Sequence, residues 1–344
     1  MQESITDVNN EIIEKYIKNV FKRDFKYKGI SSTVISIIPI DSEKKRAFLV
    51  KIKDRSIFMK INLPFWDEEN TKIKMHNERM ALEILNNAKI KNVPRVYKYE
   101  SNSSVFGTDV LLMNYIYDTR KSLDKDSIYR LVRIIKKIHS IRSKSFTVPF
   151  GGDFSSSYKG NGHDFIRFYL EVLGKDIVNI EKMHFLKKTH LEDFLNSAFF
   201  FISKKIKQNI ELFKKTKEFS MIHGHLARNS ERKHILIDRK NNMYIIDWEN
   251  VCFGEKELEV ASFLYENGMM NSYLKKNFID LYRDNNSLDI KKIFIYIYLI
   301  QLDDLIEELK KKLILRSRDN SLDVDFFLSI HRQRRILYKL SKKL

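Results

Sequence analysis

The fold of this chain is decided by a stretch that contains MIHGHL at residues 221–226, IIDWE at 245–249, FGE at 253–255 and LEVA at 258–261. Within it, Asp247 closes an apolar run that is typical of a buried strand. A buried carboxylate needs a cation, a metal or several hydrogen-bond donors, because an unpaired charge is costly to remove from water. Asp247 is therefore a candidate magnesium ligand.

Upstream of this stretch the periodicity is that of a small β-rich lobe. An amphipathic N-terminal helix precedes residues 33–61, which alternate and are rich in valine, isoleucine and phenylalanine, as strands are. Residues 69–87 have the spacing of a helix, and residues 93–99 and 105–116 are two further strand-like runs. The sequence therefore predicts a sheet that is interrupted by one helix.

Downstream of Asp118 nearly all of the sequence has helical periodicity, with one exception. Residues 235–238 and 244–248 are short β-branched runs separated by a polar segment, which predicts a hairpin. The predicted fold class is therefore α+β, with a small β-rich lobe at residues 1–116 and a larger, mainly helical lobe at residues 117–344.

A lysine stands inside the apolar strand IFMKI at residues 57–61. Period two places Lys60 and Phe58 on the face opposite the other three side chains. On the following helix, Glu78 falls on an apolar stripe, where a carboxylate is costly unless it is paired. Lys60 and Glu78 are therefore a candidate ion pair. The alternative, in which Lys60 reaches solvent at a sheet edge and Glu78 borders the stripe, stays open at this level.

Composition argues against several other classes of protein. The 63 Lys+Arg against 45 Asp+Glu give a formal charge of +18, but the lysines are scattered and form no basic arm, so specific nucleic-acid binding is not expected. The single cysteine, Cys252, allows no internal disulfide and fits a reducing cytosol. The longest apolar run, residues 293–300, is too short to cross a membrane. We therefore expect a cytoplasmic protein without a membrane partner.

In their order along the chain, these residues resemble the aminoglycoside phosphotransferase and choline kinase-like family, a branch of the protein-kinase-like fold that phosphorylates small-molecule hydroxyls. The resemblance runs from about Gly29 to at least Leu264. Glu255 and Glu259 stand where the family's later motif has aspartates, and IHS at residues 138–140 resembles its Leu-His-Ser helix end. The resemblance implies a bilobal protein-kinase-like fold, ATP (or GTP) and Mg²⁺ as cofactors, and a small-molecule hydroxyl as acceptor.

The resemblance also implies a role for each matching residue. Lys60 resembles the lysine that grips the α- and β-phosphates, Glu78 the glutamate that orients it, and Asp247 the magnesium-binding aspartate. The run LLMNYI at residues 111–116 resembles the hinge that hydrogen-bonds adenine. The nucleotide contacts implied there are Met113, Asn114, Tyr115 and Ile116.

Two departures from the family pattern fall where the chemistry takes place. His225 replaces the catalytic aspartate, and the asparagine expected five residues later is Ser230, with Asn229 one place early. An alternative alignment takes His234 as the asparagine equivalent after a four-residue insertion. A neutral imidazole accepts a proton near neutral pH, so His225 is the predicted base. Asn229 or Ser230 is predicted to complete the metal site.

The predicted function is an ATP-dependent phosphotransferase with His225, Asp247 and Lys60 as its catalytic residues. One alternative is a pseudokinase that keeps the fold and binds a nucleotide or a partner in a regulatory role. Another places a transition metal on His223 and His225 together with His234 or Asp247.

The family resemblance implies an acceptor pocket among the helices of the large lobe, where acidic side chains hold cationic acceptors. An acidic patch at residues 303–308 is a candidate for such a site. Its alternative is a solvated helix face paired with the lysines at residues 310–312. The stretch at residues 151–162 is either a mobile lid or a plain connector.

Overall fold

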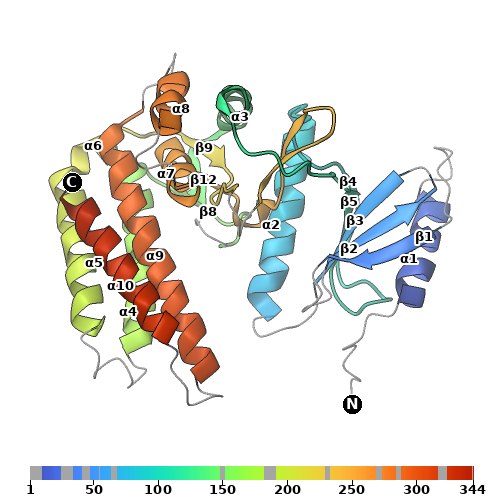
Figure 1. Cartoon of the computed structure of the whole chain (residues 1–344), viewed down its shortest axis with the longest axis horizontal. Coiled ribbons are helices and arrows are strands. Elements are labelled where there is room, and N and C mark those ends of the chain that lie inside the picture. The colour runs from blue at the N-terminus through green and yellow to red at the C-terminus, as the bar shows by residue number, and fades with distance from the viewer. Residues whose placement is uncertain are drawn as a thin grey trace. The chain divides into compact units, whose positions relative to one another are not determined.

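The computed structural model describes residues 10–24, 34–40, 47–53, 55–62, 68–147, 152–181, 191–228, 233–268, 273–283, 288–316, 324–342 and 344. These residues fall into two compact units (Figure 1). The first holds the described residues of Met1–Arg130, Gly151–Ser155 and Lys233–Val251. The second holds those of Leu131–Phe150, Ser156–Arg232 and Cys252–Leu344. The units therefore interleave along the chain, and the segment with the predicted hairpin belongs to the first.

The first unit is built on a five-stranded antiparallel sheet with the strand order β1-β2-β3-β5-β4. Its strands are β1 (Val34–Pro39), β2 (Ala47–Ile52), β3 (Arg55–Ile61), β4 (Val96–Glu100) and β5 (Val110–Asn114). β4 and β5 are shorter than the predicted runs because a turn separates them. Asp109 holds this turn by accepting the backbone N–H of Asn102 at 2.9 Å and the hydroxyl of Tyr99 at 2.8 Å.

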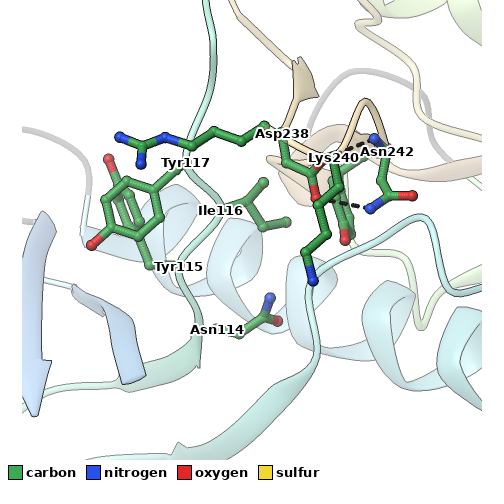
Figure 2. A pocket seen from close by; sticks show the side chains of 9 residues that line it. Asn114, Tyr115, Ile116, Tyr117, Asp238, Lys240 and Asn242 are labelled. Carbon is green, nitrogen blue, oxygen red and sulfur yellow. Dashed lines mark hydrogen bonds between the residues drawn. The ribbon is translucent and has the colours of Figure 1, made fainter. Parts of the chain in front are cut away.

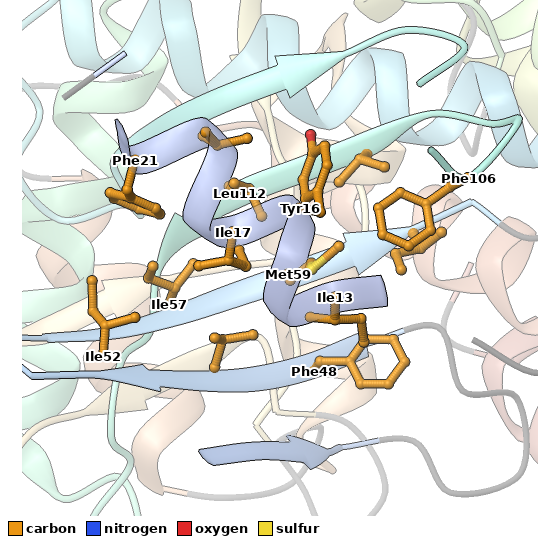
Figure 3. Packing of buried hydrophobic residues seen from close by; sticks show 14 residues of the cluster. Ile13, Tyr16, Ile17, Phe21, Phe48, Ile52, Ile57, Met59, Phe106 and Leu112 are labelled. Atoms are coloured by element: carbon orange, nitrogen blue, oxygen red, sulfur yellow. The ribbon is translucent and has the colours of Figure 1, made fainter. Parts of the chain in front are cut away.

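One face of this sheet packs against α1 (Asn10–Asp24), as Figure 3 shows. The period-two alternation of β3 turns Ile57 and Met59 into this core, where Ile13 and Ile17 of α1 are equally buried. Lys60 takes the opposite face of β3. The alternation thus buries the apolar side chains of β3 on one face of the sheet and places the charged side chain of Lys60 on the other face.

The first unit also contains α2 (Glu68–Asn87), the hairpin of β10 (Ile235–Ile237) and β11 (Met243–Ile245), and the 3-10 helix η3 (Trp248–Asn250). The predicted helix at residues 69–87 and the predicted hairpin are confirmed. Asn92 ties the hairpin to the segment after α2. Its side-chain amide donates to the carbonyl of Met243 at 2.8 Å, and its own carbonyl accepts the N–H of Ile245 at 2.8 Å.

The second unit is mainly helical, and α3 (Lys125–His139) runs from the first unit into it. Its other helices are α4 (Gly162–Glu181), α5 (Leu191–Gln208), α6 (Ile210–Lys214), α7 (Lys256–Glu266), α8 (Tyr273–Arg283), α9 (Ile290–Arg316) and α10 (Val324–Ser341). In the part of the chain that the structure describes, no helix combines the length and apolar character needed to cross a bilayer.

Short strands accompany these helices. One sheet has the order β12-β9-β6, from β6 (Arg142–Ser143), β9 (Phe219–Ile222) and β12 (Cys252–Gly254), and a second pairs β7 (Ser145–Thr147) with β8 (Ser157–Lys159). The expectation that only the hairpin interrupts the helices is therefore wrong. Runs of two to four residues are too short to show a period-two pattern. β8 lies in the stretch at residues 151–162, whose role as a lid stays a prediction.

Candidate active site

Lys60 lies among three carboxylates of the first unit. Its Nζ donates to Glu78 Oε2 at 3.0 Å, to Glu249 Oε2 at 3.2 Å and to Asp247 Oδ1 at 3.4 Å. Glu78 is almost fully buried on α2, whereas the side chains of Asp247 and Glu249 are 38% and 25% exposed. The Lys60–Glu78 pair that the spacing left open is therefore present. Two further carboxylates, partly open to solvent, share the same ammonium group.

This cluster determines the ionisation of Lys60. Burial alone would lower the pKa of the ammonium, but the charges of Glu78, Glu249 and Asp247 outweigh it and hold that pKa well above its ordinary value. Burial also raises the pKa of the Glu78 carboxyl, and the charge of Lys60 opposes this shift. At neutral pH a permanent cation therefore lies beside exposed carboxylate oxygens. That combination suits a phosphate bound together with a divalent cation.

The backbone conformation after β11 determines where the carboxylate of Asp247 lies. This residue has φ 65° and ψ 58°, in the left-handed region that few residues other than glycine adopt. Trp248 is fully buried, and its indole N–H donates to a backbone carbonyl of β11 at 3.0 Å. Asn77 of α2 donates to the carbonyl of Glu249 at 3.4 Å. These contacts fix the turn so that the carboxylates of Asp247 and Glu249 both reach Lys60.

His234 stands beside Asp247. Its Nε2 lies 3.7 Å from Asp247 Oδ2, and its side chain is only 12% exposed. Asn229 and Ser230, the other candidates for the asparagine position, lie outside the described residues. Within the described ranges, no group of three or more histidine, cysteine, aspartate or glutamate side chains is arranged to hold a metal ion. A cation at Asp247 would therefore need water or phosphate oxygens to complete its coordination, as Mg²⁺ commonly does.

The predicted hinge consists of the end of β5 and the two residues that follow it. The backbone N–H groups of Asn114 and Tyr115 are used within the unit, donating to the carbonyls of Arg95 at 3.1 Å and Ser56 at 3.0 Å. The N–H of Ile116 donates to no atom of the described residues. Ile116 is therefore the hinge position with a backbone donor available to a ligand.

A cavity of about 590 Å³ opens beside this segment (Figure 2). Residues 114–117, which include the end of the predicted hinge at residues 111–116, line one side. The turn of the β10–β11 hairpin and β11 line the other. Asp238 shapes the turn by accepting the backbone N–H of Asn242 at 2.8 Å and its side-chain amide at 3.0 Å. Met113 lies two residues beyond Leu111, the cross-strand neighbour of Lys60, and so shares the Lys60 face of the sheet.

In the second unit, a buried glutamate of α7 anchors the loop after β9. Glu259 is 3% exposed and accepts the backbone N–H groups of His223 at 3.2 Å and Gly224 at 3.0 Å. Gly224 has φ 82°, a conformation that strains any residue with a Cβ atom. Burial raises the pKa of Glu259 to about 7, although both N–H donors oppose this shift. Glu259 therefore supports the loop that carries His225.

His225 itself pairs with a carboxylate that the sequence reasoning missed. Its Nε2 lies 2.6 Å from Oε1 of Glu266, the last residue of α7. The side chain of Glu266 is 6% exposed and that of His225 is 23% exposed. A signal was available, because Glu266 follows Glu259 by seven residues and two helical turns return to the same face.

Glu255, the other glutamate of the later motif, has a structural partner. It is fully buried and accepts the ammonium of Lys292 and the hydroxyl of Tyr296, both at 2.6 Å. These contacts join the start of α7 to α9.

The acidic patch of α9 is not a simple solvated face. Lys310 Nζ pairs with Asp176 and with Glu307, both at 2.9 Å. Burial, with the charges of Asp304 and Glu307, raises the pKa of Asp303 to about 7. The role of this patch as an acceptor site stays a prediction.

The sequence profile of the fructosamine kinase family matches residues 13–291, which is most of the chain and includes the Lys60 cluster and the α7 glutamates. The chain belongs to the fructosamine kinase family. The predicted resemblance to small-molecule kinases is therefore confirmed.

Individual proteins resemble this chain over part of its sequence or in its fold. A curated relative, the LicA homolog of Mycoplasma capricolum subsp. capricolum, is 44% identical over 62 residues, 17% of this chain and 26% of the relative. The match thus spans about a quarter of that relative. Choline kinase LicA from Streptococcus pneumoniae has a TM-score of 0.60 at 16% identity, over 96% of this chain and 99% of that chain. An aminoglycoside phosphotransferase in ternary complex with ADP and hygromycin B has a TM-score of 0.59 at 14% identity. The match covers 96% of this chain and 98% of that chain. These likenesses confirm the α+β, protein-kinase-like fold.

In this fructosamine kinase family protein, three predicted site residues lie together in the first unit, namely Lys60, Glu78 and Asp247. Glu249 joins them and was not predicted, although it follows Asp247 by only two residues. Its contact depends on the left-handed turn at Asp247, which periodicity does not reveal.

Proposed function

We propose that the protein transfers the γ-phosphoryl group of ATP to a hydroxyl of a small molecule. The observation that carries this proposal is the Lys60 cluster, in which one cation is held by buried Glu78 and flanked by the carboxylates of Asp247 and Glu249. Phosphoryl transfer is mostly positioning and neutralisation of charge, for which a lysine and metal-binding carboxylates are the essential parts.

Each residue of the first unit then has a defined task. Lys60 would bind the α- and β-phosphates, and Glu78 would keep its side chain extended along the sheet. Asp247 and Glu249 would hold Mg²⁺, which when bound would neutralise charge on the phosphates. Carboxylate oxygens with exposed surface fit this ion, which takes one or two protein carboxylates plus phosphate and water. The N–H of Ile116 would donate to adenine.

In the second unit, His225 would accept the proton of the acceptor hydroxyl. As this proton leaves, a bond forms between the acceptor oxygen and the γ-phosphorus, and the bond from that phosphorus to the β–γ bridging oxygen breaks, so that ADP departs. The retained Lys60, Glu78 and Asp247 fit the binding of a nucleotide and a metal. The transfer assay below distinguishes a working kinase from an inactive nucleotide-binding protein.

The test is the transfer of labelled γ-phosphate from ATP, or from GTP in a parallel series, with Mg²⁺ present. The acceptor panel should include fructosamines, choline and hygromycin B, because the family name and the matched structures point to such compounds. We expect label in at least one acceptor with wild-type protein and none with Lys60→Met. Lys51→Met, an equivalent change on the neighbouring strand β2, should keep the activity. Equal transfer by Lys60→Met and wild type would refute the assignment.

His234 should set the metal preference. An imidazole beside Asp247 favours first-row transition metals over Mg²⁺, which prefers hard oxygen donors. We therefore expect Mn²⁺ to raise the melting temperature of the ATP-bound protein at lower concentration than Mg²⁺. His234→Asn should move this ratio about tenfold towards Mg²⁺. His76→Asn, on α2, is the control, and an unchanged ratio in His234→Asn would remove His234 from the metal site.

A further inference from the structure

The contact between His225 and Glu266 is not expected from the family pattern. That pattern has an aspartate at position 225, and an aspartate there would place two carboxylates next to each other. His225 Nε2 and Glu266 Oε1 are 2.6 Å apart, a short distance typical of a charge-assisted hydrogen bond. The side chain of Glu266 is 6% exposed, so its carboxylate is largely removed from water. The other titratable side chains near this pair are His223, whose Nδ1 accepts the N–H of His225 at 3.3 Å, Arg228 on the same loop, and Glu259 of α7, which binds the loop backbone.

We propose that Glu266 is the positioning residue of a His–Glu dyad in which His225 is the proton acceptor. This inference rests on the proposed function for its chemical role, but the dyad itself can be tested without catalysis.

A carboxylate that accepts Nε2–H selects one of the two neutral tautomers of imidazole. The proton resides on Nε2, and the lone pair that accepts the acceptor's proton is then on Nδ1. When His225 takes up this proton, the imidazolium carries its positive charge next to the negative charge of Glu266. The same logic of base and orienting carboxylate operates in serine hydrolases. It explains how a histidine can stand where the family has an aspartate.

The burial of Glu266 strengthens this coupling. Charges interact more strongly where water is excluded, and a nearby opposite charge shifts a pKa by about one to three units. Glu266 lies at the end of α7, and the same helix holds the loop through Glu259. One rigid element therefore fixes both the backbone of the loop and the imidazole ring.

The experiment measures the ionisation of His225 by NMR, using the ring proton resonances of the full-length protein as a function of pH. Glu266→Gln keeps the size and a hydrogen-bonding carbonyl but removes the charge. We expect the midpoint of His225 to fall by about one pH unit or more. Glu257→Gln is the matched control, because Glu257 is a largely buried glutamate on the same helix. An unchanged His225 midpoint in Glu266→Gln would overturn the proposal.

The second part of the experiment measures the pH dependence of kcat. The low-pH limb of kcat should move to lower pH in Glu266→Gln by the same amount as the NMR midpoint, and kcat should fall about 10²-fold while KM for ATP stays unchanged. A shifted midpoint without any transfer in wild type would support the dyad and reject the proposed function. A loss of kcat with the pH limb unmoved would make Glu266 merely structural.

A third measurement guards against simple unfolding of the variant. In a His225→Asp background, Glu266→Gln should raise the melting temperature, because it removes repulsion between two carboxylates. In the wild-type background the same change should lower it. A decrease in both backgrounds would contradict the charge coupling.

Discussion

Replacing Asp247 by asparagine is expected to lower the rate of phosphoryl transfer by about 10³-fold. Asparagine keeps the volume but removes the negative charge that faces Lys60 at 3.4 Å and the oxygen that would hold the metal most directly. The measurement is kcat with ATP and saturating Mg²⁺ on whichever acceptor becomes labelled.

Asp126→Asn is the matched control for this prediction. Asp126 is an exposed residue in the first turn of α3, in the same unit, and it is not among the residues that line the cavity. Its activity should stay within about twofold of wild type. A similar loss in both variants would point to a general effect on the first unit, and full activity in Asp247→Asn would exclude Asp247 as a metal ligand.

Glu259→Ala should have the largest effect on stability. It would leave the buried N–H groups of His223 and Gly224 without their acceptor, at a cost of about 3 kcal/mol or more. The melting temperature should then fall by roughly 6–12 °C. Glu218→Ala, which removes an exposed partner of Arg142, should change it by no more than about 2 °C. Equal melting temperatures for the two variants would show that Glu259 does not anchor the loop.

The same residue should contribute to the pH dependence of stability. Burial raises the pKa of Glu259 from its ordinary value of 4.5 to about 7. Between these values the folded protein holds a proton that the unfolded chain has lost, so the contribution of Glu259 to stability falls as pH rises. Glu259→Gln cannot titrate. The melting temperature of wild type relative to this variant should therefore be higher at pH 5 than at pH 8, and a constant difference would contradict the shift.

Much of the fold could be predicted from local patterns. The alternation around Lys60, the helix of Glu78 and the hairpin before Asp247 follow from periodicities within segments of about five to twenty residues. The short strands β6 to β9 and β12 could not be predicted in this way. They exist because neighbouring segments supply their hydrogen bonds, which no pattern of two to four residues encodes.

The candidate site, too, was only partly predictable from the sequence. Lys60, Glu78 and Asp247 each stand out because a charge in an apolar segment demands a partner, and the resemblance to a kinase family assigned their roles. The contact of Lys60 with Glu249 joins positions 189 residues apart in sequence. Neither burial nor spacing specifies such a distant partner.

The amino-acid sequence by itself determined the β-rich and helical segments and the face of the strand that carries Lys60. The family resemblance added the prediction that His225 replaces an aspartate. Only the tertiary structure decided that Glu249 joins Lys60, that His234 adjoins Asp247 and that Glu266 meets His225. The physical reason is that periodicity reflects which side of an element is buried, whereas the identity of the partner depends on how separate elements pack. Packing brings together residues whose separation in the chain carries no local signal.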